Sequence, residues 1–151
     1  MSDSLRVEKR EEQVSLFMTD GVIFDGRVHL AQYAMLHSGE QTVLDLLMEK
    51  NPFLPMHSSS GEFHLIQKKL ISHLRCEILL QKEIEHTERQ VKISFPGNET
   101  LQGVLRIDMP NHSVRLTDYI NGGNDFFPLF SGGISYLVNR SLIRDIVLLN
   151  G

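Results

Sequence analysis

Four basic side chains in two matching stretches of the sequence are the strongest candidates for chemistry. Lys68 and Lys69 follow one apolar run, and Arg140 and Arg144 lie beside a similar run later in the chain. Ammonium and guanidinium groups donate hydrogen bonds to phosphate, so this cluster could hold the backbone of single-stranded RNA. The alternative is that these groups are solvated charges at a strand turn.

The other reactive side chains do not form a recognisable catalytic or metal-binding motif. The Ser-Ser-Ser-Gly run at 58–61 lacks the Gly-x-Ser-x-Gly elbow of hydrolases, and there is no phosphate-cradling glycine pattern. We expect surface positions for the seven histidines, which show no close pair at ligand spacing: His29, His37, His57, His64, His73, His86 and His112. We therefore predict no catalytic residues, no metal and no cofactor, and a protein that is not an enzyme.

Two aspartates, Asp45 and Asp118, recur 73 residues apart, each before a polar stretch. They could be functional carboxylates, but an aspartate oxygen also caps helical turns, and we favour capping. An aromatic residue and a proline follow each aspartate. We interpret these segments as short helical turns with an apolar plug, formed by Phe53 and Pro55 in one and by Phe126, Phe127 and Pro128 in the other. The aromatic rings could stack on bases, but burial is their more usual role.

These recurrences belong to a longer internal repeat that relates Val14–Glu77 to Val91–Leu149. Residues 24–30 match residues 101–107 in every apolar position, and Gly26 coincides with Gly103. Residues 65–71 match residues 137–143 in the same way, so that Lys68 and Arg140 become equivalent. A glycine inside a strand marks a sharp bend or a close approach of another backbone. The pattern predicts two copies of one small unit.

The alternation of apolar residues predicts strands, and the Asp-Gly and Pro-Gly-Asn turns predict hairpins. We therefore expect an all-β fold with small α content: a first repeat at 1–80 with a short N-terminal segment, a polar linker at 81–90 and a second repeat at 91–151. Strong bending at Gly26 and Gly103 would close each repeat into a five-stranded barrel.

Composition limits the expected environment and partners. The net charge of −4 gives no overall attraction to nucleic acid. The single cysteine, Cys76, rules out an internal disulfide and is expected at a half-buried strand position. The charged N-terminal stretch and the lack of a long apolar run favour a cytoplasmic protein without a membrane partner.

Two motifs of the sequence resemble those of the Sm-like family, which includes the bacterial host-factor RNA chaperone. The first motif is similar to Val14–Gly21 followed by Gly26–Leu30, and the second is similar to Ile66–Ile71 and Val138–Ile143. The resemblance implies two tandem Sm-like barrels. At the family's base-binding positions the chain differs, because Gln67-Lys68 and Asn139-Arg140 replace the Arg-Gly pair.

The resemblance also implies self-association, since Sm-like rings join the fourth strand of one unit to the fifth strand of the next. A tandem chain could join its own halves first, and three chains would then form a pseudo-hexameric ring. We expect a non-enzymatic module that acts as a scaffold or a regulatory protein-binding unit. The alternative is RNA binding through a ring face that carries Lys68, Lys69, Arg140 and Arg144.

Overall fold

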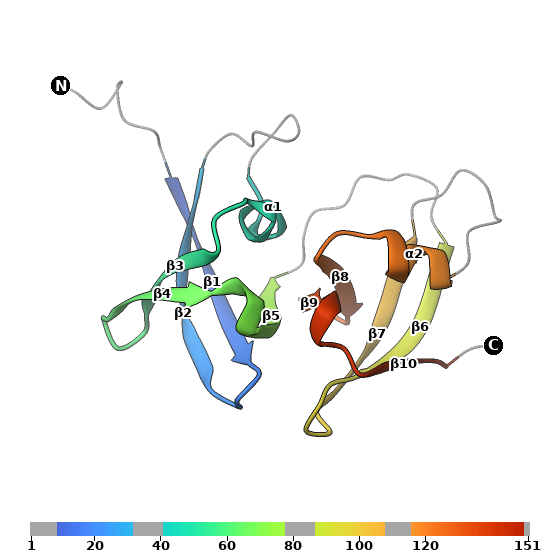
Figure 1. The fold of residues 1–151 in the computed structure, drawn as a ribbon. Coiled ribbons are helices and arrows are strands. Elements are labelled where there is room, and N and C mark those ends of the chain that lie inside the picture. The colour runs from blue at the N-terminus through green and yellow to red at the C-terminus, as the bar shows by residue number, and fades with distance from the viewer. Residues whose placement is uncertain (1–8, 32–40, 78–86, 108–115, 150–151) are drawn as a thin grey trace.

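Short strands make up most of the residues that the structure describes. The computed structural model describes residues 9–31, 41–77, 87–107 and 116–149. Their elements are β1 (Lys9–Met18), β2 (Ile23–Ala31), α1 (Val43–Met48), β3 (Phe53–Ser58), β4 (Phe63–Gln67), the 3₁₀ turn η2 (Lys68–Leu70), β5 (Ile71–Glu77), β6 (Thr87–Ser94), β7 (Thr100–Ile107), α2 (Leu116–Gly122), β8 (Phe126–Ser131), β9 (Ile134–Asn139), the 3₁₀ turn η3 (Arg140–Leu142) and β10 (Asp145–Leu148). The predicted all-β class with small α content is confirmed (Figure 1).

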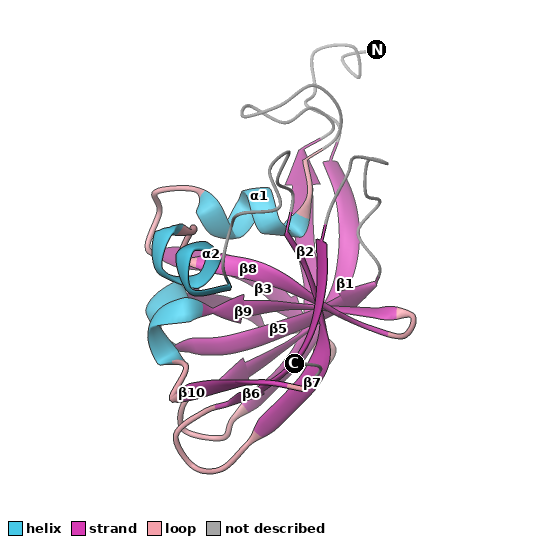
Figure 2. Cartoon of the chain, turned by 90° about the vertical axis from the view of Figure 1, so that its right-hand side faces the viewer, coloured by secondary structure: helices cyan, strands magenta, loops and turns pink. Residues whose placement is uncertain are grey.

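All ten strands belong to one antiparallel sheet with the order β10-β6-β7-β8-β9-β5-β1-β2-β3-β4. This order contains two blocks of five strands. The first block is β1–β5 and the second block is β6–β10, and each has its helix before its third strand and its 3₁₀ turn before its fifth. Figure 2 shows how strongly the strands of this sheet twist. Closure of each block into a barrel stays a prediction.

The two blocks meet where β5 pairs with β9, and we call this pairing the seam. It runs antiparallel over five residue pairs, from His73 opposite Val138 to Glu77 opposite Ile134. The hydrophobic core of the first block includes Phe126 and Leu137 of the second. The fifth strand of one block therefore joins the fourth strand of the other, as we expected for the two halves of one chain.

Both glycines of the predicted bends lie where a neighbouring backbone comes very close. A Cβ atom on Gly26 would lie 2.2 Å from the carbonyl oxygen of His57 on β3. A Cβ atom on Gly103 would lie 2.6 Å from the carbonyl oxygen of Phe130 on β8. Only glycine permits these approaches, so the prediction of a close backbone contact is confirmed at both positions.

The predicted apolar plugs are wrong in their secondary structure. The helical turns exist as α1 and α2, but Phe53 and Pro55 lie in β3, and Phe126, Phe127 and Pro128 lie in β8. Phe126 and Phe127 are buried, whereas Phe53 is 46% exposed. The aromatic rings of the two segments therefore do not have the same role.

The prolines are compatible with strands because of where they lie in the sheet. Pro55 faces Leu65 on β4, and Pro128 faces Leu137 on β9. On their other sides β3 pairs with β2 only at His57 and Ser58, and β8 pairs with β7 only at Phe130. The missing amide hydrogen of each proline thus removes no bond from those ladders.

The predicted linker ends earlier than expected. β6 begins at Thr87, so the last four residues of the predicted linker at 81–90 lie in a strand. The rest of that linker is outside the described residues. No helix in the described ranges is both long and apolar enough to cross a membrane.

Candidate functional site

The candidate site begins at α1, whose first turn is closed by a capping box. Thr42 is the N-cap, and its hydroxyl accepts a hydrogen bond from the backbone N–H of Asp45 at 3.1 Å. The Asp45 carboxylate accepts one from the backbone N–H of Thr42 at 2.8 Å. This reciprocal pair stabilises a helix of only six residues. Capping is confirmed for Asp45, and Asp118 has the corresponding place in the first turn of α2.

Lys68 binds the other end of the same helix. Its Nζ donates to the carbonyl oxygens of Leu46 at 3.1 Å and Glu49 at 3.0 Å. The residue is 8% exposed, and burial lowers the pKa of its ammonium group, although Glu49 acts in the opposite direction. The Leu46 carbonyl also accepts the backbone N–H of Glu49, at 3.3 Å. A cation at the carboxyl end of a helix is favourable because the helix dipole is negative there. Lys68 therefore fixes η2 to α1.

Arg140, the equivalent of Lys68, makes the corresponding contact in the second block. Its Nη1 donates to the carbonyl oxygens of Ile120 at 3.3 Å and Asn121 at 2.8 Å, near the end of α2. Nη2 lies 3.8 Å from the Asp125 carboxylate. Because both basic residues bind the end of the preceding helix, their recurrence in the sequence has a structural cause.

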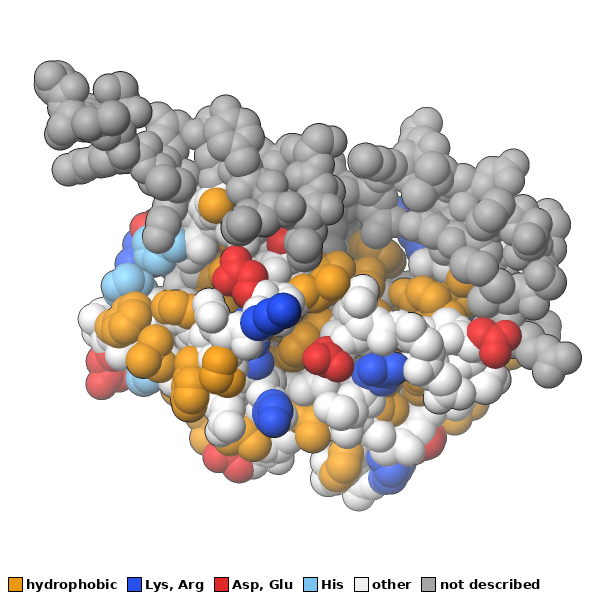
Figure 3. Space-filling view, turned by 45° about the horizontal axis from the view of Figure 1, so that its top comes forward, with side chains coloured by type: hydrophobic (Ala, Val, Ile, Leu, Met, Phe, Trp, Pro, Cys, Tyr) orange, Lys and Arg blue, Asp and Glu red, His pale blue; other side chains and the backbone are white. Residues whose placement is uncertain are grey.

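The four predicted phosphate ligands are distributed over two places. Lys68 and the exposed Lys69 border a groove between the blocks, with a volume of about 680 Å³. The groove is also lined by polar groups of both blocks, Lys50, Asn124, Asp125, Asn139 and Ser141. In Figure 3, Lys and Arg side chains lie beside Asp and Glu side chains and form no continuous basic surface.

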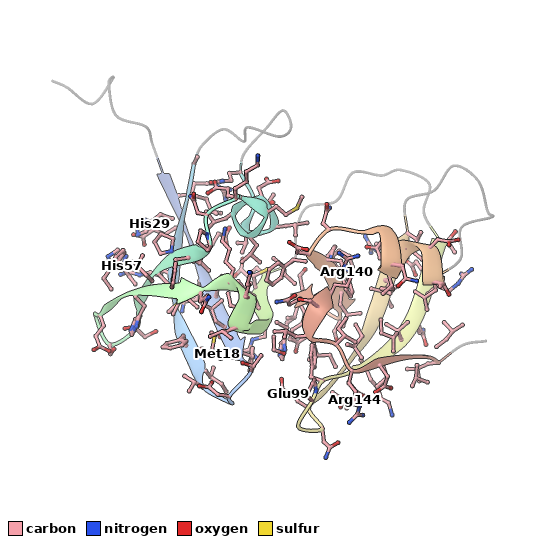
Figure 4. The ribbon with its side chains drawn as sticks, in the orientation of Figure 1. Met18, His29, His57, Glu99, Arg140 and Arg144 are labelled. Carbon is pink, nitrogen blue, oxygen red and sulfur yellow. The ribbon has the colours of Figure 1, made fainter. Side chains whose placement is uncertain are left out.

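Arg140 and Arg144 lie together beside α2 and η3, at a second depression of about 380 Å³. Arg144 donates to the Asp145 carboxylate at 2.8 Å and to the side chain of Asn98 at 3.1 Å. Figure 4 shows Arg140 near α2 and Arg144 lower in the second block. The structure therefore pairs Lys68 with Lys69 and Arg140 with Arg144, each in its own block.

His73 is an important side chain that the sequence interpretation placed wrongly. It was expected at the surface, but it is 1% exposed. Its ring stacks on Phe17 of the first block, at 4.4 Å between centroids, and on Phe95 of the second block, at 5.1 Å. Its position in the apolar strand 71–76 is the only sequence signal that could have revealed this burial.

Both ring nitrogens of His73 have polar neighbours. Nε2 lies 3.1 Å from a carboxylate oxygen of Glu99, and Nδ1 lies 3.0 Å from the hydroxyl of Ser72. A neutral ring can donate to Glu99 and accept from Ser72, so both contacts are satisfied without a buried charge. Burial lowers the pKa of His73 to about 4, because the half-exposed Glu99 carboxylate is screened by water and does not offset desolvation. The neutral His73 ring therefore lies between the two blocks and contacts both.

Two histidines that lie 28 residues apart in the sequence come together in the structure. His29 Nε2 and His57 Nδ1 lie 3.2 Å apart on neighbouring strands (Figure 4).

Cys76 is buried, and burial, together with Glu12 and Glu77, raises the pKa of its thiol to about 12. The thiol is therefore protonated at neutral pH. Cys76 lies in a strand as predicted, but it is buried and not half-buried.

Three comparisons and one search bear on the chemistry of these groups. Comparisons with protein-family models, with curated proteins and with solved structures find no match. Within the described ranges, no group of three or more His, Cys, Asp or Glu side chains could hold a metal ion. The function of these side chains must therefore be inferred from their own geometry.

Replacement of Lys68 by methionine should destabilise the protein, because it removes the donor to the two carbonyls of α1. We expect the free energy of unfolding to fall by about 1–3 kcal/mol, measured by chemical denaturation. Lys69→Met is the matched control, since the side chain of Lys69 is exposed, and its effect should be close to zero. Equal effects of the two variants would show that Lys68 does not hold α1.

The stability of the protein should depend on pH through His73. Between pH about 6.5 and about 4 the unfolded chain binds a proton at this residue and the native protein does not. The stabilisation is complete above pH 6.5 and decreases by roughly 3 kcal/mol as the pH falls to about 4. His73→Phe keeps an aromatic ring between Phe17 and Phe95 and removes the titration, so its unfolding free energy should decrease less over this range. Identical pH profiles for the two proteins would contradict this role.

Proposed function

We propose that the chain is a non-enzymatic, Sm-like tandem module that self-associates and acts as a scaffold for protein partners. The observation that carries this proposal is the seam. It joins the fifth strand of one block to the fourth strand of the other. The two outer strands of the sheet are again a fifth strand, β10, and a fourth strand, β4. A second copy of the chain can therefore repeat the seam at each outer edge.

The residues of the outer strands β10 and β4 that correspond to the seam residues Leu74 and Leu137 are also apolar. Ile146 on β10 lies 72 residues after Leu74, and Leu65 on β4 lies 72 residues before Leu137. At the seam Leu74 faces Leu137, and both are fully buried. The repeated register would place Ile146 of one chain opposite Leu65 of the next. Leu65 is 61% exposed in the single chain, so this pairing would remove a large apolar side chain from water.

The outer surface beside β4 has a further apolar feature. A depression of about 310 Å³ lies there, and its apolar lining comes from Met18, Val22, Phe24, Phe53, Leu65, Ile66 and Leu70. At the seam Phe95, the equivalent of Met18, contacts the ring of His73 from β5. At the seam, the place that corresponds to this depression is filled by β5, the fifth strand of the first block.

One residue makes the junction between chains weaker than the seam. Asp145 on β10 has the position that His73 has on β5, and its carboxylate binds Arg144 at 2.8 Å. Covering this carboxylate with the edge of another chain would cost desolvation energy that the neutral His73 ring avoids. We therefore infer reversible association between chains and a permanent seam within each chain.

A closed ring of three chains, with six blocks, is the assembly that the resemblance to the Sm-like family favours. Each block would then have both sheet edges paired, and no edge would remain to recruit further chains. Such a ring presents the same surface several times, which suits a scaffold or a regulatory protein-binding unit.

RNA binding remains the second candidate function, and the groove between the blocks is what favours it. Lys50 and Lys69 are exposed at this groove, and each could bind phosphate. Lys68 is less suited, because two carbonyls already accept hydrogen bonds from its ammonium group. An RNA site would therefore depend on Lys50 and Lys69 more than on Lys68.

Light scattering across a size-exclusion peak tests the proposal. We expect a mass close to three times that of one chain at tens of micromolar, decreasing on dilution. Leu65→Lys places a charge at the outer edge and should give a single chain. Ile23→Lys is the control, since Ile23 is 54% exposed but lies on the inner strand β2, and it should leave the mass unchanged.

Two outcomes would change the proposal. A single chain at every concentration would exclude self-association through these edges. A high ratio of absorbance at 260 nm to that at 280 nm across the peak, lost in the double variant Lys50→Glu with Lys69→Glu, would instead support RNA binding.

A further inference from the structure

We propose that His29 and His57 form a surface site for a divalent transition-metal ion such as Zn²⁺. The two residues lie on neighbouring strands, because Arg27 on β2 faces His57 on β3 and His29 follows two residues later on the same face. Nε2 of His29 lies 3.2 Å from Nδ1 of His57. Both labelled side chains lie on the outer side of the first block in Figure 4.

The distance between the two nitrogens fits shared coordination of one ion. Zinc binds imidazole nitrogen at about 2.0–2.1 Å with tetrahedral angles, so two such ligands lie about 3.3 Å apart. The observed separation is 3.2 Å. The rings are nearly perpendicular, at 86°, with their centroids 5.1 Å apart, so they approach edge to face and do not stack. The two nitrogens therefore already have the separation that shared coordination requires.

Glu11 on β1 favours the form of His29 that can bind a metal. Its carboxylate lies 3.8 Å from Nδ1 of His29 and 3.2 Å from the guanidinium of Arg27. A carboxylate on this side favours the proton on Nδ1 and leaves a lone pair on Nε2, toward His57. Such carboxylate–histidine–metal arrangements orient ligands in many metal sites. Arg27 compensates the charge of Glu11, so Glu11 acts as a positioning residue and not as a ligand.

The number and kind of ligands define which ions the site would take. In the described part of the chain no third His, Cys, Asp or Glu completes the pair, so water would occupy the remaining positions. His64 on β4 contacts Glu62 instead, at 3.6 Å. Two imidazoles suit Zn²⁺, Ni²⁺ and Cu²⁺, and Cu²⁺ should bind most tightly of the three. Two protein ligands give weaker binding than the four of a structural zinc site.

Without a metal, the two facing nitrogens can share one proton in an imidazole–imidazole hydrogen bond. That arrangement also explains the distance, but it gives a different response to added ions. Bound metal must compete with protons for the same lone pairs, so metal affinity should weaken as the pH is lowered. A hydrogen bond alone gives no metal binding that depends on both residues.

Calorimetric titration of the untagged, full-length chain with ZnCl₂ at pH 7.5 tests the site. We expect one ion per chain at the site, and at least tenfold weaker binding for His29→Gln and for His57→Gln. His64→Gln is the matched control, since it removes a nearby histidine outside the pair and should leave the affinity unchanged. Glu11→Gln should weaken binding, because it removes the negative charge that lies 3.8 Å from Nδ1 of His29.

The outcomes separate this proposal from the hydrogen bond and from self-association. Circular dichroism melting of the metal-free variants identifies any variant that fails to fold. Zinc binding that is equal in wild type and His57→Gln, or no binding at millimolar zinc, would overturn the proposal and leave a hydrogen bond only. His29 and His57 lie on the inner strands β2 and β3, and His57 reaches β4 only through its contact with Phe63. The chain mass in the presence of a chelator should therefore be the same in wild type and both pair variants.

Discussion

Unpaired strand edges are the constraint on which this structure depends. A five-stranded block has two edges, and each edge exposes backbone groups that need hydrogen-bond partners. The seam between β5 and β9 pairs one edge of each block and buries Leu74 against Leu137. The shared core and the stacked ring of His73 both follow from this pairing. The same constraint leaves β4 and β10 as the places where another chain can add.

The basic residues show how a recurring pattern can have a structural cause. Lys68 and Arg140 recur because each block must fix a short helix to the turn before its fifth strand. A helix of six or seven residues is marginal alone and depends on such contacts. Once these cations hold carbonyl groups, the exposed Lys50 and Lys69 are the ones left for a ligand at the groove. Lys68 thus has a structural role, whereas its neighbour Lys69 stays exposed.

The sequence predicted features that depend on local chemistry and missed those that depend on register. Capping by Asp45 and the close approach at Gly26 follow from residue types and short spacing. The proline in FLPMHS hid β3, because a proline is compatible with a strand only where one side of the strand has no partner. The 3.2 Å contact of His29 with His57 depends on how β2 and β3 align. The burial of Lys68 depends on carbonyl groups about twenty residues earlier in the chain. No spacing in the sequence shows either contact.

Amide hydrogen exchange of the edge strands tests the central claim most directly. The account predicts that the outward-facing amides of β4 and β10 exchange slowly at high protein concentration and quickly after dilution. The amides of β5 and β9 should stay protected at both concentrations, since their pairing lies within one chain. Fast exchange of β4 and β10 at every concentration would contradict the claim that these edges join one chain to the next.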